Sequence, residues 1–352
     1  CLCQDKINRA IEYAIRQTLF QFRWFRADHA LHPYVRCPFV LRNTGIGLTK
    51  QEELIHATTG SEVDSHKYND VLKDEDDLAK IKMPDIEIDK QATNRYYERY
   101  CEAFDGLMPV RKTGVAVCFA PWDRIPELHG VENTLLDLYD RPAFMHAIIE
   151  KLTQINEATM LQYEKLNILD SDPYYFCCAP ACSYELPVKD NEKEQVYLKD
   201  VWCRTMAQIF GAVSPAMHDA FELQYQKRLF DRCGLVFYGC CEPLHNKIDL
   251  LRQIPNLRRI SISPWSDPDI AGEKMGDAYI MASRPNPAFV AGPQFDPEPV
   301  KKEIHHIIKA ARRNRTPLEF CLKDISTVHC RPDILSQWIS TVDEVIDAYE
   351  WQ

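Results

Sequence analysis

The chain has 352 residues, of which 45% are hydrophobic and 27% are charged, a composition typical of a folded globular protein. Its formal net charge of -10 argues against a general nucleic-acid binder, because contacts with phosphates need a basic surface. No apolar stretch reaches the roughly 18 residues of a membrane span, and the first residues lack the apolar segment of a secretory signal. The sequence therefore indicates a cytoplasmic protein. It begins at Cys1 rather than Met, which leaves a preceding segment open.

The 14 cysteines are spread along the chain and lack the dense spacing of a small disulfide-rich domain. We interpret most of them as reduced, buried thiols, which is the usual environment of a free cysteine. Three groups stand apart from the rest: Cys177 and Cys178 with Cys182, Cys240 with Cys241, and the distant Cys321 and Cys330.

The first hundred residues predict a helical and irregular extension. Apolar residues recur at helical spacing over 7–25, which predicts an amphipathic helix. Residues 50–90 are polar and acidic, and we interpret them as a solvated connection. The acidic run 74–77 lacks the alternating ligands and the glycine of a calcium loop, so a metal-binding loop is the less favoured interpretation.

Beyond this extension, residues 106–120 predict a strand with a turn. A helix over about 142–166 begins at Asp140-Arg141-Pro142, where Asp140 can cap the helix and Pro142 fits its first turn. Residues 168–187 predict a short strand that runs into an irregular loop. Ser214-Pro215 then opens a helix that extends to about Arg232.

The last third of the chain alternates regularly between strand and helix patterns. The predicted strands are 235–239, 259–263, 278–282 and 317–322, and the predicted helices are 246–254, 268–275, 298–313 and 332–350. Such alternation predicts parallel strands joined by helical crossovers. No glycine-rich phosphate loop is present, which favours a barrel over a dinucleotide-binding sheet. We therefore expect a (β/α)8 TIM barrel over 101–352, with the extension 1–100 packed on it.

In such a barrel the active site lies at the carboxyl ends of the strands. The stretches that follow the predicted strands are 238–245, 263–267, 283–287 and 323–324. Thiolate and carboxylate side chains are zinc ligands, so Cys240, Glu242 and a residue of the last strand, such as Cys321, form a candidate metal set.

Other interpretations of these residues stay open. Adjacent cysteines without a Cys-x-x-Cys spacing are more often buried thiols than ligands. Cys240 or Cys241 could instead act as a nucleophile beside a histidine, for which the candidates are His218, His245 and His329. Arg284 and Lys323 could bind a substrate carboxylate, although salt bridges with Asp267 or Asp324 explain them nearly as well.

Several ordered blocks resemble the uroporphyrinogen decarboxylase-like superfamily, and within it the anaerobic bacterial branch grouped with cobalamin-dependent methyltransferases. The blocks are Ser214-Pro-Ala-Met-His-Asp-Ala-Phe221, Tyr238-Gly-Cys-Cys-Glu-Pro-Leu244, Asn256-Leu-Arg-Arg-Ile-Ser-Ile-Ser-Pro-Trp265 and Ser283-Arg-Pro-Asn-Pro287. The resemblance covers roughly residues 100 to 350 and implies a barrel with a pocket at the strand ends.

The resemblance also implies a zinc site. In the methyltransferase branch, a His-x-Cys after a mid-barrel strand and a Cys of the last strand bind zinc. Tyr238-Gly239-Cys240 stands at the first position, so only Cys240 carries over directly. Cys321 is a looser match, and Cys241, Glu242 or Glu319 could complete the set. The arginine-rich block of the decarboxylase has no counterpart in this chain.

We therefore expect a zinc-dependent methyltransferase that transfers a methyl group between a small methylated substrate, or a thiol, and a corrinoid protein. The chain lacks the Asp-x-His-x-x-Gly sequence of corrinoid-binding domains, so a partner protein would carry the corrinoid. The alternatives are a metal-independent decarboxylase or lyase and a non-catalytic barrel subunit of a larger complex. The oligomeric state is open, with a homodimer among the options. The predicted residues are Lys323 and Asp324 for catalysis, Tyr238, His218 and Arg284 for substrate binding, and Cys240, Glu242, Cys241 and Cys321 for the metal.

Overall fold

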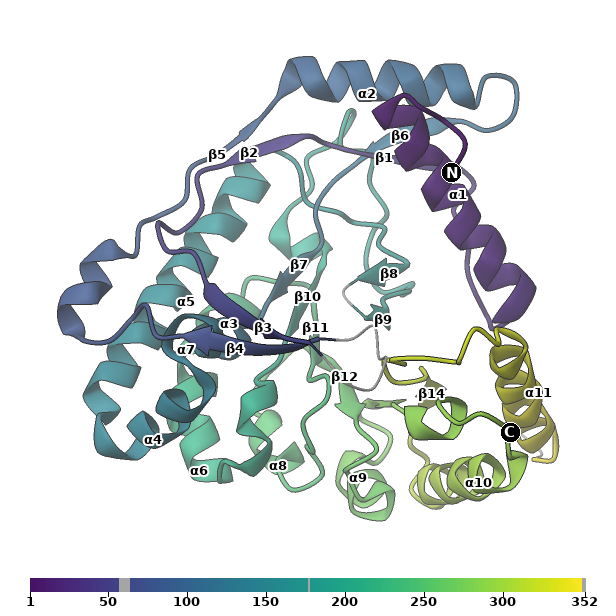
Figure 1. Ribbon diagram of the computed structural model, residues 1–352. Coiled ribbons are helices and arrows are strands. Elements are labelled where there is room, and N and C mark those ends of the chain that lie inside the picture. Colours follow the sequence, from purple (N-terminus) through teal and green to yellow (C-terminus); the bar gives the residue numbers. More distant parts are fainter. Residues whose placement is uncertain (57–63, 177, 350–352) are drawn as a thin grey trace.

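The computed structural model describes residues 1–56, 64–176 and 178–349, and its main feature is a six-stranded parallel sheet. Figure 1 shows this sheet at the centre of an α/β fold. The strands of this sheet follow one another in chain order, β7-β10-β11-β12-β13-β14, and each lies beside the one before it in that order. The strands are β7 (Val117–Phe119), β10 (Trp202–Thr205), β11 (Leu235–Tyr238), β12 (Leu257–Ile262), β13 (Ile280–Ser283) and β14 (Leu318–Phe320). All carboxyl ends therefore lie at one edge of the sheet.

The sheet forms because its strands are apolar and covered on both faces, as in most parallel sheets. All four residues of β11 are buried. Val236 and Tyr238 pack into the larger apolar core, which includes side chains of the surrounding helices. Leu235 and Phe237 point to the opposite face and pack in a second cluster with Trp202. This alternation places successive residues of one strand in two different environments.

Helices follow four of these strands, as the sequence predicts, and Figure 1 shows α8, α9 and α10 in succession along the strands β11 to β14. The helices are α8 (Ile248–Leu251), α9 (Pro268–Met275), α10 (Pro297–Arg313) and α11 (Asp333–Asp347). Asp267 caps α9 and Asp296 caps α10, each with a proline at the first helical position. These local signals explain why the predicted starts of α9 and α10 are within one residue of the observed starts.

A closed eight-stranded barrel is not shown within the described residues, where the remaining strands form two-stranded sheets. One pair is parallel, β1 (Val35–Pro38) with β6 (Val110–Thr113). The others are antiparallel: β2 (Leu41–Asn43) with β5 (Ile86–Ile88), β3 (Gln51–Ile55) with β4 (Ser65–Asn69), and β8 (Tyr175–Phe176) with β9 (Ala179–Pro180). A parallel bridge also joins Val115 to Leu169.

The amino-terminal part contains two long helices, α1 (Lys6–Trp24) and α2 (Lys90–Ala103). The predicted helix at 7–25 matches α1, whereas α2 was not predicted. Figure 1 places α1 beside the carboxyl-terminal helix α11. Two contacts join this region to α11: Ser336 Oγ donates to the carbonyl of Trp24 at 2.8 Å, and the rings of Phe25 and Trp338 stack.

The predicted solvated connection at 50–90 is more ordered than expected, although residues 57–63 lie outside the described residues. It holds the hairpin β3–β4, the 3-10 helix Glu75–Lys80 and strand β5. Asp74 caps the 3-10 helix, and Asp77 is buried where its carboxylate accepts the backbone N–H of Lys73. Asp74 thus caps a helix and Asp77 accepts a backbone hydrogen bond, two structural roles that the acidic composition of the segment does not reveal.

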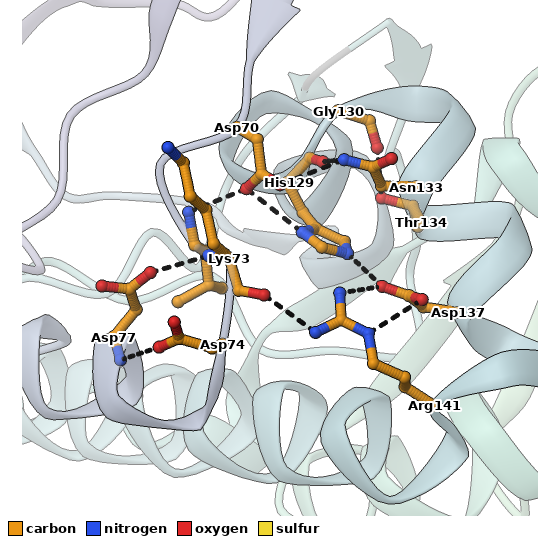
Figure 2. Close-up of polar contacts among 11 residues, drawn as sticks. Asp70, Lys73, Asp74, Asp77, His129, Gly130, Asn133, Thr134, Asp137 and Arg141 are labelled. Carbon is orange, nitrogen blue, oxygen red and sulfur yellow. Dashed lines mark hydrogen bonds and ion pairs between the residues drawn. The ribbon is translucent and has the colours of Figure 1, made fainter.

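A polar network ties this segment to the helices that follow β7, and Figure 2 shows its side chains pointing toward one another. The helices are α3 (Pro121–His129), α4 (Val131–Asp140) and α5 (Pro142–Lys165). His129 is fully buried, with Nδ1 at 3.3 Å from Asp70 and Nε2 at 2.7 Å from Asp137. Arg141 pairs with Asp137 and also donates to the carbonyl of Lys73 at 2.8 Å.

The segment predicted as one helix from Ser214 to Arg232 is divided into three parts. It consists of α6 (Pro215–His218), a π-helical turn (Asp219–Leu223) and α7 (Gln224–Phe230), with Ser214 as the cap. A π-helical turn shifts the side chains that follow it, and such turns are frequent at functional sites. No helix in the described parts of the chain is long and apolar enough to cross a membrane.

Candidate functional site

The carboxyl end of β11 turns sharply at Gly239. The residue has φ +92°, a conformation that favours glycine. A Cβ at this position would lie 2.4 Å from Cδ1 of Leu244. The peptide is held on both sides, because Gly239 N–H donates to Thr205 O at 2.8 Å and its carbonyl accepts from Arg204 at 3.1 Å. This turn carries the chain from Tyr238 to Cys240.

Three cysteine side chains meet directly after this turn. Sγ of Cys240 lies 3.4 Å from Sγ of Cys178 and 3.5 Å from Sγ of Cys241. Cys178 comes from the connection between β8 and β9, so two segments 62 residues apart supply the sulfur atoms. Cys240 is 7% exposed, and the other two side chains are half-buried. We refer to Cys178, Cys240 and Cys241 as the thiol cluster.

Two basic side chains from neighbouring strand ends flank the thiol cluster. Arg284 follows β13, and its Nη1 donates to the carbonyl of Cys178 at 2.6 Å and to Sγ of Cys321 at 3.1 Å. Lys323 follows β14, and its ammonium is among the groups that lower the pKa of the Cys241 thiol. The sequence-predicted residues Cys240, Cys241, Cys321, Arg284 and Lys323 are therefore gathered at one edge of the sheet.

The charges and contacts around the sulfur atoms shift the pKa values of the cysteines in different directions. Hydrogen bonds with Cys178 and Cys241 raise the pKa of the Cys240 thiol well above its usual range. The hydrogen bond with Cys240, assisted by the Lys323 ammonium, lowers the pKa of Cys241 to about 6. Burial raises the pKa of Cys321 against the opposing effect of Arg284. Cys241 is thus the thiolate of this group at neutral pH.

Glu242 turns toward the backbone. Its Oε1 accepts the N–H of Ala207 at 3.1 Å, and its Oε2 accepts the N–H of Cys240 at 3.0 Å. The side chain is 2% exposed. Both oxygens are thereby committed to holding the segment after β10 and the strand-end turn together. Asp324, predicted beside Lys323 as a catalytic residue, has a largely exposed side chain with its carboxylate 3.9 Å from the Lys323 ammonium.

His218 and Tyr238, both predicted to bind substrate, contact each other beneath the strand end. The Tyr238 hydroxyl lies 2.6 Å from Nε2 of His218, and both side chains are fully buried. Glu222 lies on the adjoining π-helical turn, 3.6 Å from Nε2 of His218, which is too long for a hydrogen bond. Burial raises the pKa of both Glu222 and Tyr238. These groups lie on the helix side of the sheet, so direct contact with a substrate would require them to move.

The thiol cluster offers sulfur atoms as metal ligands, but these atoms are not arranged around a common centre. Among the described residues, no group of three or more His, Cys, Asp or Glu side chains has a metal-binding arrangement. The two sulfur–sulfur contacts share Cys240 and are shorter than the separation of about 3.8 Å that four-coordinate zinc imposes on its sulfur ligands. Small outward rotations of these side chains would therefore be needed to accommodate zinc. Cys177 lies outside the described residues.

The histidines considered as partners for a cysteine nucleophile make other contacts. His218 bonds Tyr238, and Nε2 of His329 lies 2.8 Å from the carbonyl of Ala291. The ring of His245 lies beside the amide of Asn246 at 3.0 Å. None of these contacts joins a histidine to Cys241, and the basic group that lowers the pKa of Cys241 is Lys323.

The sequence prediction omits two residues of this site, Cys178 and Ser261. Ser261 Oγ donates to the carbonyl of Cys240 at 2.9 Å and accepts from Nε of Arg284 at 3.2 Å, so it links the two strand ends. The clustering of Cys177, Cys178 and Cys182 in one loop is the feature of the sequence that could have indicated Cys178 as a site residue. Ser261 lies within a predicted strand, where nothing distinguishes it from other small residues.

Comparisons with known proteins do not assign the chain to a family. No protein-family model matches it. No curated protein matches it either. Among solved structures, the chain is similar to a methyltransferase from Methanosarcina mazei, with 10% sequence identity and a TM-score of 0.45; the alignment covers 89% of this chain and 81% of that chain. Similarity at this level carries no inference about activity, so the geometry of the strand ends has to support any functional assignment.

Proposed function

We propose that this chain is a methyltransferase whose active site is the thiol cluster at the carboxyl ends of the parallel strands. The observation that carries the proposal is the meeting of Cys178, Cys240 and Cys241 between the cationic side chains of Arg284 and Lys323. Sulfur atoms gathered at the strand ends suit a reaction at a soft centre. The cationic groups would hold a charged substrate or a leaving heteroatom.

The proposal includes zinc, held by Cys240 with Cys178 and Cys241, after the small side-chain rotations described above. When bound, zinc would act as a Lewis acid on the heteroatom that carries the methyl group. Glu242 is not assigned as a ligand, because both of its oxygens bind backbone N–H groups. Cys321 is also left out, because its sulfur contacts the Arg284 guanidinium.

The acceptor in this proposal is a reduced corrinoid on a partner protein. The carbon–heteroatom bond breaks, and the heteroatom keeps the bonding electron pair and takes up a proton. The reduced corrinoid would supply the electron pair that accepts the methyl group. The chain itself would bind the donor, orient its methyl group toward the corrinoid and supply a cation, Lys323, beside the leaving heteroatom.

We also propose that the sheet belongs to a (β/α)8 barrel. The strands β7 and β10 to β14 follow one another in chain order without reversal, which is the winding of a barrel. The parallel pair β1–β6 and the parallel bridge from Val115 to Leu169 would supply the rest of the ring. In such a barrel Arg284 and Lys323 would point into the same mouth as Cys240.

The test is methyl transfer from methoxy compounds and methylamines to a cobalt(I) corrinoid protein, followed by the absorbance change of the corrinoid. Cys240→Ala should lower the rate at least about 100-fold. Cys203→Ala is the matched control, because Cys203 is a buried thiol beside Cys233 and does not belong to the thiol cluster. Equal rates for the two variants would refute the proposal.

A decarboxylase is the second candidate, and one observation favours it. Nη2 of Arg284 is buried and has no hydrogen-bond partner among the described residues, as would suit a site for a substrate carboxylate. This function requires no metal. Decarboxylation that survives exhaustive chelation and is lost in Arg284→Met would favour it over methyl transfer.

A further inference from the structure

Cys178 and Cys240 are held beside each other by their backbones as well as by their side chains. Their Sγ atoms lie 3.4 Å apart. Arg284 donates from Nη1 to the carbonyl of Cys178 at 2.6 Å and from Nε to Oγ of Ser261 at 3.2 Å. Oγ of Ser261 in turn donates to the carbonyl of Cys240 at 2.9 Å. One chain of hydrogen bonds therefore joins the two cysteine backbones.

Further contacts fix the two segments that carry these cysteines. Arg259 on β12 donates from Nη1 to the carbonyl of Pro180 at 2.6 Å and from Nη2 to that of Cys182 at 3.0 Å. On the other side, Oε2 of Glu242 accepts the N–H of Cys240 at 3.0 Å. The two sulfur atoms are thus placed next to each other in advance, which raises the effective concentration of one at the other.

Cys240 also contacts Cys241, with their Sγ atoms 3.5 Å apart, but a bond between these neighbours is disfavoured. A trans peptide sets adjacent Cα atoms about 3.8 Å apart. Disulfides usually join residues whose Cα atoms are about 4.4–6.8 Å apart. Cys178 comes from a separate segment and is not subject to this restriction. Side-chain rotations would bring its sulfur from 3.4 Å to the bond length of about 2.05 Å.

We propose that Cys178 and Cys240 are a modification site, where a hydroperoxide forms a reversible disulfide in the metal-free chain. Cys178, the more exposed of the two, loses its proton to solvent, and its sulfur attacks a peroxide oxygen. The O–O bond breaks, which leaves a sulfenic acid and a hydroxide that is protonated to water. The sulfur of Cys240 then displaces the hydroxyl group, which departs as water with the Cys240 proton. Two electrons pass from the sulfur pair to the peroxide.

The disulfide would close the site to zinc. Two of the three proposed ligands would be lost, because zinc binds cysteine as the thiolate. A thiol reductant would restore both by thiol–disulfide exchange. As a control of methyl transfer the inference rests on the proposed function, whereas formation of the bond requires neither zinc nor a corrinoid protein.

Peptide mapping of the full chain tests the bond. The reduced chain, freed of metal by chelation under nitrogen, is treated with one equivalent of hydrogen peroxide, and the remaining thiols are alkylated in urea. Mass spectrometry after non-reducing digestion should show the Cys178–Cys240 link as the main disulfide, absent after treatment with dithiothreitol. The neighbouring thiols of Cys203 and Cys233, both buried, should stay reduced. A main product that links Cys240 to Cys241, or no link at Cys240, would overturn the proposal.

Variants test the partner and the hydrogen bonds that position it. Cys178→Ser should remove the linked peptide, and its retention would overturn the assignment of Cys178. Ser261→Ala should lower the equilibrium constant for disulfide formation, measured against glutathione, about fivefold, because one bridging hydrogen bond is lost. Ser263→Ala is the matched control, because Ser263 is also buried and directly follows β12. Equal constants for the two serine variants would refute the positioning role of Ser261.

Failure of the disulfide can be distinguished from failure of the proposed function. A chain that binds zinc through Cys240 but forms no Cys178–Cys240 link when metal-free would refute the modification site and leave the proposed methyl transfer standing. A chain that forms the link but never binds zinc would retain the modification site and refute the zinc-dependent reaction.

Discussion

Two polar regions of this molecule, each around a fully buried histidine, differ in how completely their polar groups are paired. Around His129, the carboxylates of Asp70 and Asp137 and the guanidinium of Arg141 all have partners, as Figure 2 shows. Beneath the thiol cluster, neither oxygen of Glu222 and neither polar atom of the Gln226 side chain has a hydrogen-bond partner among the described residues. Both regions contain a fully buried histidine.

The difference indicates different roles. A fully paired network stabilises the fold, because each buried polar group recovers the hydrogen bonds that it loses on leaving water. Buried groups without partners cost stability, and natural proteins retain them mainly where function requires them. We therefore assign the His129 network to structure and the strand-end region, with its thiol cluster, to function.

The largest expected effect concerns the reactivity of Cys241. Because its pKa is lowered to about 6 from the usual 9.0, alkylation of the metal-free chain by iodoacetamide should rise with pH around a midpoint near 6. Cys203, whose pKa burial raises well above 9.0, should stay unreactive over the same range. Lys323→Met should move the midpoint upward. Mass spectrometry of the labelled peptides measures this, and a midpoint near 9 for Cys241 would remove the thiolate from the account.

The second prediction neutralises a carboxylate of the paired network. Asp137→Asn should lower the free energy of unfolding by about 2 kcal/mol, because the bonds to His129 and Arg141 lose their charge. Asp137 has a lowered pKa, first through Arg141, so its contribution is present above the pKa of the unfolded chain and is lost as pH falls through the folded pKa. Urea unfolding measures the change, with the exposed Asp140→Asn on the same helix as the control.

The third prediction neutralises a carboxylate beneath the thiol cluster, where we expect the opposite change in the free energy of unfolding. Glu222→Gln should leave stability unchanged or raise it by about 1 kcal/mol at neutral pH, because the carboxylate is buried without a hydrogen bond. The raised pKa of Glu222 means that the wild type loses stability as pH rises from the unfolded toward the folded pKa. Urea unfolding at several pH values should show that the variant lacks this loss. A destabilisation as large as that of Asp137→Asn would erase the contrast between the two regions.

The elements that the sequence predicted well are those with local signals. Pro268 and Pro297, each after a capping aspartate, mark the starts of two helices, and the continuous apolar run of β11 marks a buried parallel strand. Helix α2 was missed, although Asp89 caps it, because its sequence is mostly polar. The hairpin β3–β4 was missed because its strands are exposed and lack a buried face.

The grouping of the candidate site residues was predicted in part for the same reason. The strand-end rule correctly gathers Cys240, Arg284 and Lys323, because it depends only on strand direction. The contact between Cys178 and Cys240 depends on how a loop 62 residues away folds over the strand end, which no local pattern records. The orientation of Glu242 toward backbone N–H groups likewise depends on the neighbouring strand β10.

The most direct test of the central claim is the zinc content of protein purified without added metal, measured by elemental analysis. Wild type, Cys240→Ala and the buried-thiol control Cys203→Ala should be compared at equal protein concentration. We predict about one zinc per chain in wild type and in Cys203→Ala, and none in Cys240→Ala. No zinc in wild type, or equal zinc in all three, would contradict it.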